Sequence, residues 1–380
     1  MLTSEIALMA LISAPFHRFA GGKPIQVTSY CPSPDGSTVA IVGGDDSLHL
    51  VRVEPGGEDR RLKLPGGNLD DASFSPDGAY LATWNPNGGV RLIDVRHHEE
   101  ASVIGVVGSP QRGSNLEFSR DGARLLIHGQ NSSPLLWSTS RKELIRYLGA
   151  DKEIVEYAVW SPDTAWIATM TIRGVVRIWD GVSGEPRLGP LQLACSANGI
   201  ALDPSGKRIA VGFDDAMVRV FDVEKGTFDG ARSYEDQDFF GDLEADALRY
   251  SADGRHLLTG TSWWVGSWSA EDGHEEWRSD LRYDQWKRLR VTYLPGDAIV
   301  FASRGARMID ARSGETLREL PGAESRDYSL ARNGTRLFGI EEGGLIVREA
   351  KSYDTLFAIT LDPQGRVVVR DTAPRVESNR

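Results

Sequence analysis

The 380-residue sequence predicts an all-β fold, a single β-propeller built from four-stranded blades. Two observations lead to this prediction. A turn sequence, S-P-D-G in its fullest form, recurs along the chain, and short alternating apolar runs flank each copy. A regular period of this size is typical of repeat architectures, in which one unit cannot bury its apolar face without its neighbours.

The turns set the number of units. Six plain copies stand at residues 33–36, 75–78, 119–122, 161–164, 203–206 and 251–254. Weaker copies stand at 294–297 and 331–334, and a fragment at 362–365 is consistent with one final strand. Counted at the fourth residue of each turn, and at the third, Gly296, in the seventh copy, the steps are 42, 44, 42, 42, 48, 42 and 38 residues. The count favours eight blades, and seven, the commoner number, is the alternative.

Each unit reads as four strands. An aromatic or apolar residue precedes most turn glycines by four positions, at Phe74, Phe118, Trp160, Leu202, Tyr250 and Leu330. A second apolar residue follows the turn by fifteen positions, at Val51, Ile93, Trp137, Trp179 and Phe221. Proline presets the backbone of the first turn and glycine supplies its positive φ, so two strands reverse there. Turns at 182–185 and 312–315 then start a fourth strand.

These patterns carry a family resemblance. The S-P-D-G turn is followed by third-strand sequences such as D-D-x-x-V-R-V-F-D and V-V-R-I-W-D, and the combination resembles the WD-repeat proteins from about Val27 to Phe357. Only Trp179-Asp180 is a true W-D pair, and the family's G-H dipeptide is missing from its expected place. The resemblance implies a scaffold that binds protein partners.

A second propeller class stays open as an alternative. Residues 270–277 faintly resemble the docking motif A-x-D-x-x-T-G-x-x-x-W of quinoprotein-like propellers. Both classes need glycine in this turn for the same steric reason.

Composition limits the domain organisation. With 40% hydrophobic residues, eight units of this length consume almost the whole chain, so we expect one ring-closed propeller over residues 25–372. Residues 1–24 are expected to form a short helix or a ring-closing strand, and residues 373–380 a flexible tail. The apolar stretch at 6–12 lacks the positive leading residues of a secretory signal, and no apolar run is long enough to insert into a membrane.

Charge and cysteine content limit location and partners. The net charge of −11 opposes general nucleic-acid binding, which needs a positive stripe. Cys31 and Cys195 fall about half a ring apart and are not expected to form a disulfide, which favours a reducing compartment and a cytoplasmic location.

Motifs for chemistry are missing. The sequence has none of the nucleophile, phosphate-loop or zinc motifs, so we expect no catalytic residue, no metal and no cofactor. The one histidine cluster, His97-His98-Glu99-Glu100, reads as a solvated turn because adjacent residues of an extended segment point apart. His49, His128 and His256 read as partly buried strand residues. A propeller enzyme or small-ligand binder that uses the central channel is the alternative.

The longest step contains an acidic insertion. It carries Phe239 and Phe240 between acidic residues that include Asp238 and Asp242, and it joins the fourth strand of unit five to the first strand of unit six on the top face. Exposed phenylalanines indicate a surface that a partner covers. Alternatives are a solvated flexible loop and a calcium site, although the calcium-loop spacing is missing.

Unit six has unusual aromatic content. Five of the ten tryptophans lie between residues 263 and 286. Trp268 and Trp277 have expected packing positions, whereas Trp263, Trp264 and Trp286 do not, and Arg288 stands beside the last of them. Tryptophan and arginine dominate binding hot spots, so we expect partner contacts here, with local loop packing as the alternative.

Together these features predict a non-catalytic interaction scaffold or sensor. Its partners would be proteins, bound through the top-face loops of blades five to seven. A sensor domain tied by its N-terminal segment to a separate effector protein is a further alternative.

Overall fold

The structure is a computed structural model that describes residues 27–43, 47–54, 59–63, 71–85, 89–97, 99–104, 115–128, 133–149, 155–161, 163–171, 173–192, 197–213, 217–235, 248–260, 264–281, 291–293, 299–302, 307–319, 328–330, 335–341, 344–349, 355–364 and 366–371. These residues contain strands and turns and no helix. Among them, therefore, no helix has the length and apolar character that a membrane span requires.

The described strands form eight antiparallel sheets, the number of units that the turns favour. Sheets 1 and 2 contain β1 (Val27–Pro32), β2 (Thr38–Gly43), β3 (Ser47–Arg52), β4 (Asp59–Lys63), β5 (Asp71–Phe74), β6 (Tyr80–Asn85), β7 (Gly89–Asp94) and β8 (Glu99–Ile104). Sheets 3 and 4 contain β9 (Asn115–Phe118), β10 (Arg124–His128), β11 (Leu135–Ser138), β12 (Glu143–Tyr147), β13 (Val155–Trp160), β14 (Trp166–Thr171), β15 (Val175–Asp180) and β16 (Pro186–Gln192).

The second half of the chain repeats this order. Sheets 5 and 6 contain β17 (Ala197–Leu202), β18 (Arg208–Phe213), β19 (Met217–Asp222), β20 (Thr227–Glu235), β21 (Arg249–Tyr250), β22 (His256–Gly260), β23 (Trp264–Ser269) and β24 (Glu275–Asp280). Sheets 7 and 8 contain β25 (Val291–Tyr293), β26 (Ile299–Ala302), β27 (Arg307–Asp310), β28 (Thr316–Glu319), β29 (Tyr328–Leu330), β30 (Arg336–Glu341), β31 (Gly344–Glu349), β32 (Thr355–Leu361) and β33 (Val367–Asp371).

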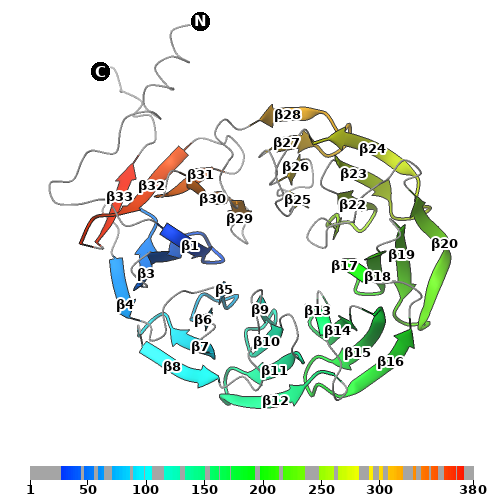
Figure 1. The fold of residues 1–380 in the computed structure, drawn as a ribbon, viewed down its shortest axis with the longest axis horizontal. Helices are drawn as coiled ribbons and strands as arrows, with labels where there is room; N and C mark the ends of the chain where they lie inside the picture. The colour runs from blue at the N-terminus through cyan, green and yellow to red at the C-terminus, as the bar shows by residue number, and fades with distance from the viewer. Residues whose placement is uncertain are drawn as a thin grey trace, which may run out of the picture.

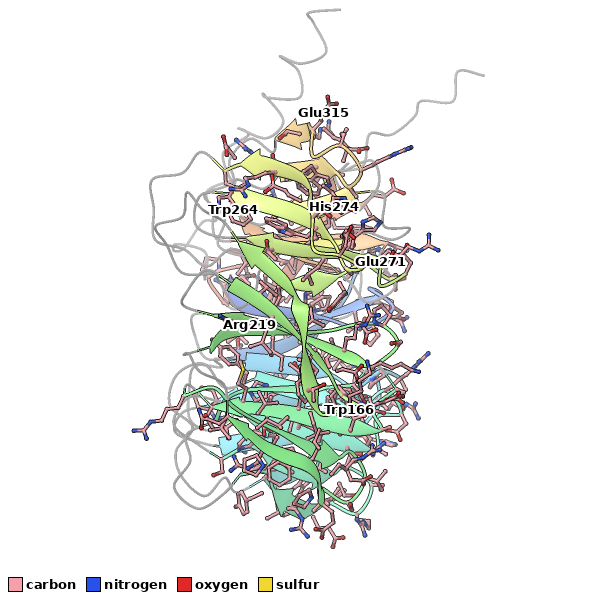
Figure 2. The ribbon with its side chains drawn as sticks, turned by 90° about the vertical axis from the view of Figure 1, so that its right-hand side faces the viewer. Trp166, Arg219, Trp264, Glu271, His274 and Glu315 are labelled. Carbon is pink, nitrogen blue, oxygen red and sulfur yellow. The ribbon has the colours of Figure 1, made fainter. Side chains whose placement is uncertain are left out.

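The sheets stand side by side in a ring, with the first strand of each nearest the central axis and the fourth on the outside (Figure 1). This is the predicted β-propeller. Because strands alternate in direction, first-to-second and third-to-fourth turns share one face of the ring, the bottom face. The other connections share the top face. Figure 2 shows Trp264 toward the top face and Glu271, His274 and Glu315 toward the bottom face.

The S-P-D-G turn is held by a repeated set of hydrogen bonds. In sheet 2, the Ser75 hydroxyl donates to Asp77 Oδ1 at 2.6 Å, and the Gly78 N–H donates to the Ser75 carbonyl at 2.8 Å. The Tyr80 N–H donates to Ser75 Oγ at 2.9 Å, and the Ala79 N–H to Asp77 Oδ1 at 3.0 Å. The polar groups of the turn are therefore hydrogen-bonded within the turn itself, without any contact from a neighbouring sheet.

The fifth turn keeps these bonds with the residue types exchanged. Its sequence is D-P-S-G, and the hydroxyl of Ser205 now donates to the carboxylate of Asp203. Asp203 Oδ1 also accepts the N–H groups of Lys207 and Arg208, both at 2.9 Å. One hydroxyl and one carboxylate two residues apart are sufficient, in either order, because the hydroxyl both donates and accepts.

Side chains between neighbouring sheets form the core. One cluster joins Met170 and Ile178 of sheet 4 to Ile209, Val211 and Phe221 of sheet 5, all nearly excluded from solvent. Full burial of one such side chain contributes about 1.5–3 kcal/mol. Phe221, the apolar anchor predicted fifteen positions after the fifth turn, is thus one of the residues by which sheet 5 contacts sheet 4.

The ring closes by side-chain packing between sheets 8 and 1. Val39 and Val51 of sheet 1 pack with Phe338 and Val347 of sheet 8. The Tyr30 hydroxyl donates to the Phe338 carbonyl at 2.7 Å. In the described residues each sheet is built from consecutive strands, so the first and last sheets share no strand.

Sheet 8 carries an additional strand. β33 pairs antiparallel with β32 from Phe357↔Asp371 to Leu361↔Val367, which makes this sheet five-stranded. The turn between them begins at Asp362, whose Oδ1 accepts the Gln364 and Arg366 N–H groups at 2.9 and 2.8 Å. The final strand expected from the fragment at 362–365 is confirmed.

A buried tryptophan–threonine hydrogen bond is present in some sheets and lost in others. Trp179 Nε1 donates to Thr169 Oγ1 at 2.8 Å in sheet 4, and Trp268 does the same to Thr259 at 2.7 Å in sheet 6. In sheet 2 Thr83 is the equivalent threonine, but Ile93 occupies the tryptophan position, and the buried Thr83 hydroxyl has no hydrogen-bond partner among the described residues.

Sheet 3 shows the reverse loss. Trp137 occupies the tryptophan position, but Ile127 occupies the threonine position, and the buried Trp137 Nε1 has no partner. Sheets 2 and 3 thus each keep one half of the same pair. An unpaired buried donor or acceptor costs about 1–3 kcal/mol.

The same substitution should therefore have different effects in two sheets. We expect Thr169→Val to lower the free energy of unfolding by about 1–3 kcal/mol, because it leaves the buried Trp179 N–H without an acceptor. Thr83→Val removes a hydroxyl that already lacks a partner, so its effect should be neutral or stabilising. Urea unfolding of both variants measures the difference, and equal losses would contradict this account of the pair.

Candidate functional site

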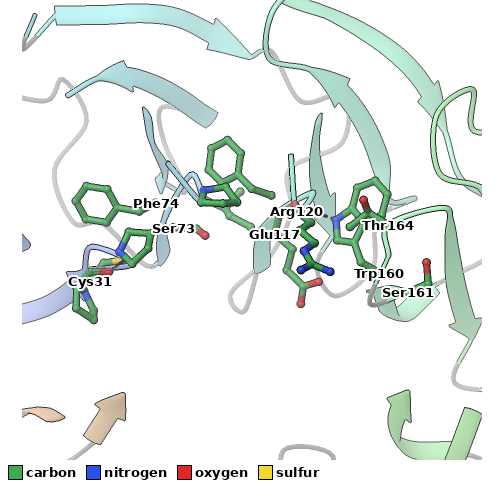
Figure 3. Close-up of a pocket in the computed structure, with 13 residues that line it drawn as sticks. Cys31, Ser73, Phe74, Glu117, Arg120, Trp160, Ser161 and Thr164 are labelled. Atoms are coloured by element: carbon green, nitrogen blue, oxygen red, sulfur yellow. Dashed lines mark hydrogen bonds between the residues drawn. The ribbon is translucent and has the colours of Figure 1, made fainter. Parts of the chain in front are cut away.

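A pocket lies on the inner rim of sheets 1 to 4, where the first strands reach the bottom-face turns. Its volume is about 820 Å³. It is lined by Cys31, Pro32, Pro34, Ser73, Phe74, Pro76, Leu116, Glu117, Phe118, Arg120, Trp160, Ser161 and Thr164. Figure 3 shows these residues in a row that follows the rim. We call this site the inner-rim pocket.

The lining comes from equivalent positions of four successive sheets. The position four residues before the turn glycine contributes Pro32, Phe74, Phe118 and Trp160. In the fourth turn, Thr164 takes the place of that glycine. The preceding position contributes Cys31, Ser73 and Glu117, and the second turn residue contributes Pro34, Pro76 and Arg120. The repeat therefore produces a row of similar apolar positions, interrupted by a few polar side chains.

Arg124 fixes the wall between sheets 3 and 4. Its guanidinium lies 5.6 Å from the Trp160 ring centroid, donates to the Gly181 carbonyl at 2.7 Å and pairs with Asp121 at 2.8 Å. The Trp160 indole donates to the Glu117 carbonyl at 3.2 Å. These contacts hold Trp160 in one orientation, so the pocket wall is rigid.

Arg120 supplies positive charge to the pocket. It replaces the turn proline of sheet 3, and its side chain is exposed. Figure 3 shows Arg120 and Glu117 on the side of the pocket that faces the ring axis. Arg120 forms no ion pair with any residue that the structure describes. Its guanidinium is thus available to a carboxylate or phosphate, which it can bind through two parallel hydrogen bonds.

Thr164 gives the pocket a strained backbone. It stands where the other plain turns have glycine, and its φ is +57°. A β-branched residue with positive φ is an outlier. Gly181 accommodates it, since a Cβ at Gly181 would lie 2.4 Å from the Thr164 carbonyl oxygen. Strain of this kind is concentrated at functional sites.

Exchanging threonine and glycine between two turns should expose this strain. We expect Thr164→Gly to raise the free energy of unfolding by up to about 1 kcal/mol, because relief of backbone strain outweighs the lost methyl packing. Gly78→Thr should lower it by about 1–2 kcal/mol. A Cβ at Gly78 meets no atom within 4 Å, so that loss comes from the backbone alone. Thermal unfolding tests both, and a clearly destabilised Thr164→Gly would contradict the strain.

A serine, a histidine and an aspartate form a hydrogen-bonded chain in sheet 1. Ser47 Oγ lies 2.8 Å from His49 Nε2, and His49 Nδ1 lies 2.9 Å from Asp59 Oδ1. Ser47 and His49 are two residues apart on β3 and share a face, while Asp59 is on β4. Sequence reasoning missed this chain, although the i, i+2 spacing on a predicted strand was an available signal.

The order of burial in this chain is opposite to that of a catalytic triad. The serine and histidine are 2% and 0% exposed, whereas the Asp59 side chain is 23% exposed. A catalytic serine must meet its substrate, and the buried carboxylate orients the histidine from behind. In sheet 1 the carboxylate faces solvent and the hydroxyl faces the core. The chain therefore satisfies buried polar groups.

Sheet 6 contains a related network. The Ser267 hydroxyl donates to Glu276 Oε2 at 2.7 Å, and His256 Nδ1 lies 2.8 Å from both Glu276 oxygens. Ser267 is fully buried between the third and fourth strands. The polar groups of this sheet are also used in cross-strand bonds. His256 is half-buried on its strand, as predicted, whereas His49 is fully buried.

His128 differs from the other strand histidines. It ends β10, is 5% exposed, and neither ring nitrogen has a hydrogen-bond partner in the part of the chain that the structure describes. Burial lowers the pKa of His128 from 6.5 to about 4, because a charged imidazolium would lose its hydration without gaining a partner. The ring is therefore neutral in the folded protein at pH 7.

This histidine should make stability depend on pH. Between pH 6.5 and about 4 the unfolded chain binds a proton that the folded chain does not, so stability falls as pH falls through this window. The loss should total about 3 kcal/mol. We expect His128→Leu to remove this part of the slope in urea unfolding at pH 8 and pH 5. The exposed His97→Gln variant is the control, and an unchanged slope in His128→Leu would contradict the assignment.

Most of the predicted contact residues cannot be placed. Phe239, Phe240, Asp238, Asp242, Trp263, Trp286 and Arg288 lie outside the described residues, as do the acidic residues of the calcium alternative. Within the described part of the chain, no three His, Cys, Asp or Glu side chains are grouped as a metal site would require.

Trp264 is placed, and it is a packing residue. It begins β23, is 7% exposed and belongs to a core cluster with Trp268 and Val218. The guanidinium of Arg278 lies 4.6 Å from the Trp264 ring centroid. This enclosure agrees with the alternative of local packing, and a partner contact at Trp264 stays a prediction. Trp268 and Trp277 are buried, as predicted.

Comparison with known proteins supports the fold. Residues 14–131 match the family described as the lipoprotein LpqB beta-propeller domain. Protein hir-1 of Neurospora crassa is 26% identical over 52% of this chain and 18% of its own length. Protein hir1 of Schizosaccharomyces pombe is 27% identical over 53% of this chain and 20% of its own length.

A different protein matches a similar share of the chain. Telomerase protein component 1 of Mus musculus is 24% identical over 53% of this chain and 8% of its own length. The chain therefore spans a fifth or less of the length of these relatives.

Proposed function

We propose that this WD-repeat-like β-propeller acts as a non-catalytic scaffold for protein partners. The partners would bind through the top-face loops around sheets 5 to 7. The observation that carries the proposal is the internal use of its reactive side chains. The Ser47–His49–Asp59 and Ser267–Glu276–His256 groups, which combine a serine, a histidine and a carboxylate, are committed to bonds within single sheets. What remains for function is a rigid ring and its loops.

The sheet topology supports the choice of face. β20 ends and β21 begins at the top face. β24 likewise ends and β25 begins at this face. In sequence, the segments between these strands carry the predicted contact residues Phe239, Phe240 and Trp286.

The residue types support partner contacts. Within these segments and the adjoining turn, Phe239, Phe240, Trp263 and Trp286 are large aromatic side chains that lose little entropy on binding, and Arg288, Asp238 and Asp242 add charge. Trp264 supports this surface from within the core, because its ring is fixed between the strands and Arg278. The name of telomerase protein component 1 describes a component of an assembly, which is in keeping with a subunit role for this chain.

Removing the aromatic side chains tests the surface. We expect a Trp263→Ala, Trp286→Ala and Arg288→Ala variant to lose at least one abundant partner in affinity purification from the native source, quantified by mass spectrometry. Truncation of a hot-spot tryptophan costs about 2 kcal/mol or more, which is about thirtyfold in affinity.

The control variant carries His274→Ala and Glu315→Ala on the bottom face, where both side chains are exposed. Both variants should keep the wild-type melting temperature. An unchanged partner list in the top-face variant would exclude these side chains as the scaffold surface.

A further inference from the structure

We propose that the inner-rim pocket is a second binding site, which takes an extended peptide segment of a partner protein. The segment would place apolar side chains along the row that contains Phe74, Phe118 and Trp160, and a carboxylate on Arg120. The site lies at the bottom-face turns, on the opposite side of the ring from the proposed scaffold loops, and does not depend on them.

The shape of the pocket suits an extended chain. Its lining runs across four sheets, and each sheet offers the same positions to the rim. The inner strands β1, β5 and β9 contact one another directly, so these positions are close neighbours. A ligand with a repeating backbone can meet a repeating wall at several points, whereas a compact ligand uses only one sheet. The volume of about 820 Å³ is in the range of ligand sites.

The wall of the pocket is rigid and largely apolar. Phe74 and Phe118 are 7% exposed and Trp160 is 9% exposed, so each presents a small fixed area to the pocket. Pro34 and Pro76 stand beside them in turns that are held by their own hydrogen bonds. A partner therefore pays little for ordering this surface when it binds.

The Arg120 guanidinium selects an acidic residue in the ligand, while Glu117 adds the opposite charge to the same lining. Arg120 is exposed and makes no ion pair with the described residues, whereas the neighbouring Arg124 is occupied by Asp121, Gly181 and Trp160. The same turn position in sheets 1 and 2 holds proline, so the repeat does not need an arginine here. A planar guanidinium without a partner is matched by a carboxylate that it can bind at two points.

Thr164 is an independent indication that this rim is specialised. It lines the pocket, is 8% exposed and holds a positive φ that glycine would adopt without strain. The fold therefore bears a local cost at this rim, which is typical of a functional surface.

A charge-swap experiment tests the proposal. Random dodecapeptides displayed on phage are selected on the full-length protein, and the recovered peptides are titrated by fluorescence anisotropy. We expect recovered sequences to share an aspartate or glutamate flanked by apolar residues. Affinity should fall about tenfold or more in Arg120→Glu. A peptide with its acidic residue changed to lysine should then bind Arg120→Glu better than it binds the wild type.

The repeat supplies a matched control for folding. Arg120→Pro restores the S-P-D-G turn and removes the charge, so it should lose affinity while keeping the wild-type melting temperature. Trp286→Ala, on the proposed top-face surface, should leave peptide binding unchanged, which separates this site from the scaffold surface.

The selection would overturn the proposal if no peptide were enriched, or if the enriched peptides shared no acidic residue. The titrations would overturn it if Arg120→Pro bound the peptide within about twofold of the wild-type affinity, or if Trp286→Ala lost peptide binding. Competition by N-acetylaspartate at the concentration of the peptide would also overturn it, because the site would then recognise a small anion without using the apolar row.

Discussion

The hydrogen bond between a serine hydroxyl and an aspartate carboxylate two residues later is the interaction on which the structure depends. It recurs in the turns of sheets 1, 2, 3, 4 and 6 at 2.5 to 2.7 Å, and in sheet 5 with the residue types exchanged. Each bond closes the turn between the two inner strands and fixes their register. Without that register the alternating apolar residues would not all reach the neighbouring sheet.

The same bonds keep the turn carboxylates ionised. The Ser75 hydroxyl lowers the pKa of Asp77, and the Ser251 hydroxyl lowers the pKa of Asp253. In sheet 4 the Ala165 N–H has the largest effect on the pKa of Asp163, followed by the Ser161 hydroxyl. Their stabilising contribution is therefore present above pH 4 and is lost as pH falls below the ordinary aspartate value.

Side-chain contacts away from the turns tolerate more variation than the turns do. The tryptophan–threonine bond is complete in sheets 4 and 6 and half-lost in sheets 2 and 3, yet the sheets keep the same arrangement. Ring closure also relies on packing, through Val39, Val51, Phe338 and Val347, together with Tyr30 and the Arg336–Gly36 hydrogen bond of 2.7 Å. A ring that is held in this way can vary its loops and its inner rim while the framework stays rigid, which is what a binding platform requires.

The sequence by itself determined the fold, because turn chemistry and strand periodicity are local properties that residues a few positions apart already express. It identified the four-stranded unit, the apolar anchors such as Phe221 and the final strand after Asp362. Only the tertiary structure decided which side chains from different strands and sheets meet. The burial of Trp264 under Arg278, the contact of Asp59 with His49 and the gathering of Phe74, Phe118, Arg120 and Thr164 at one rim all depend on packing in three dimensions. Spacing along the chain does not encode such meetings, since each strand contributes only one or two ordinary residues to them.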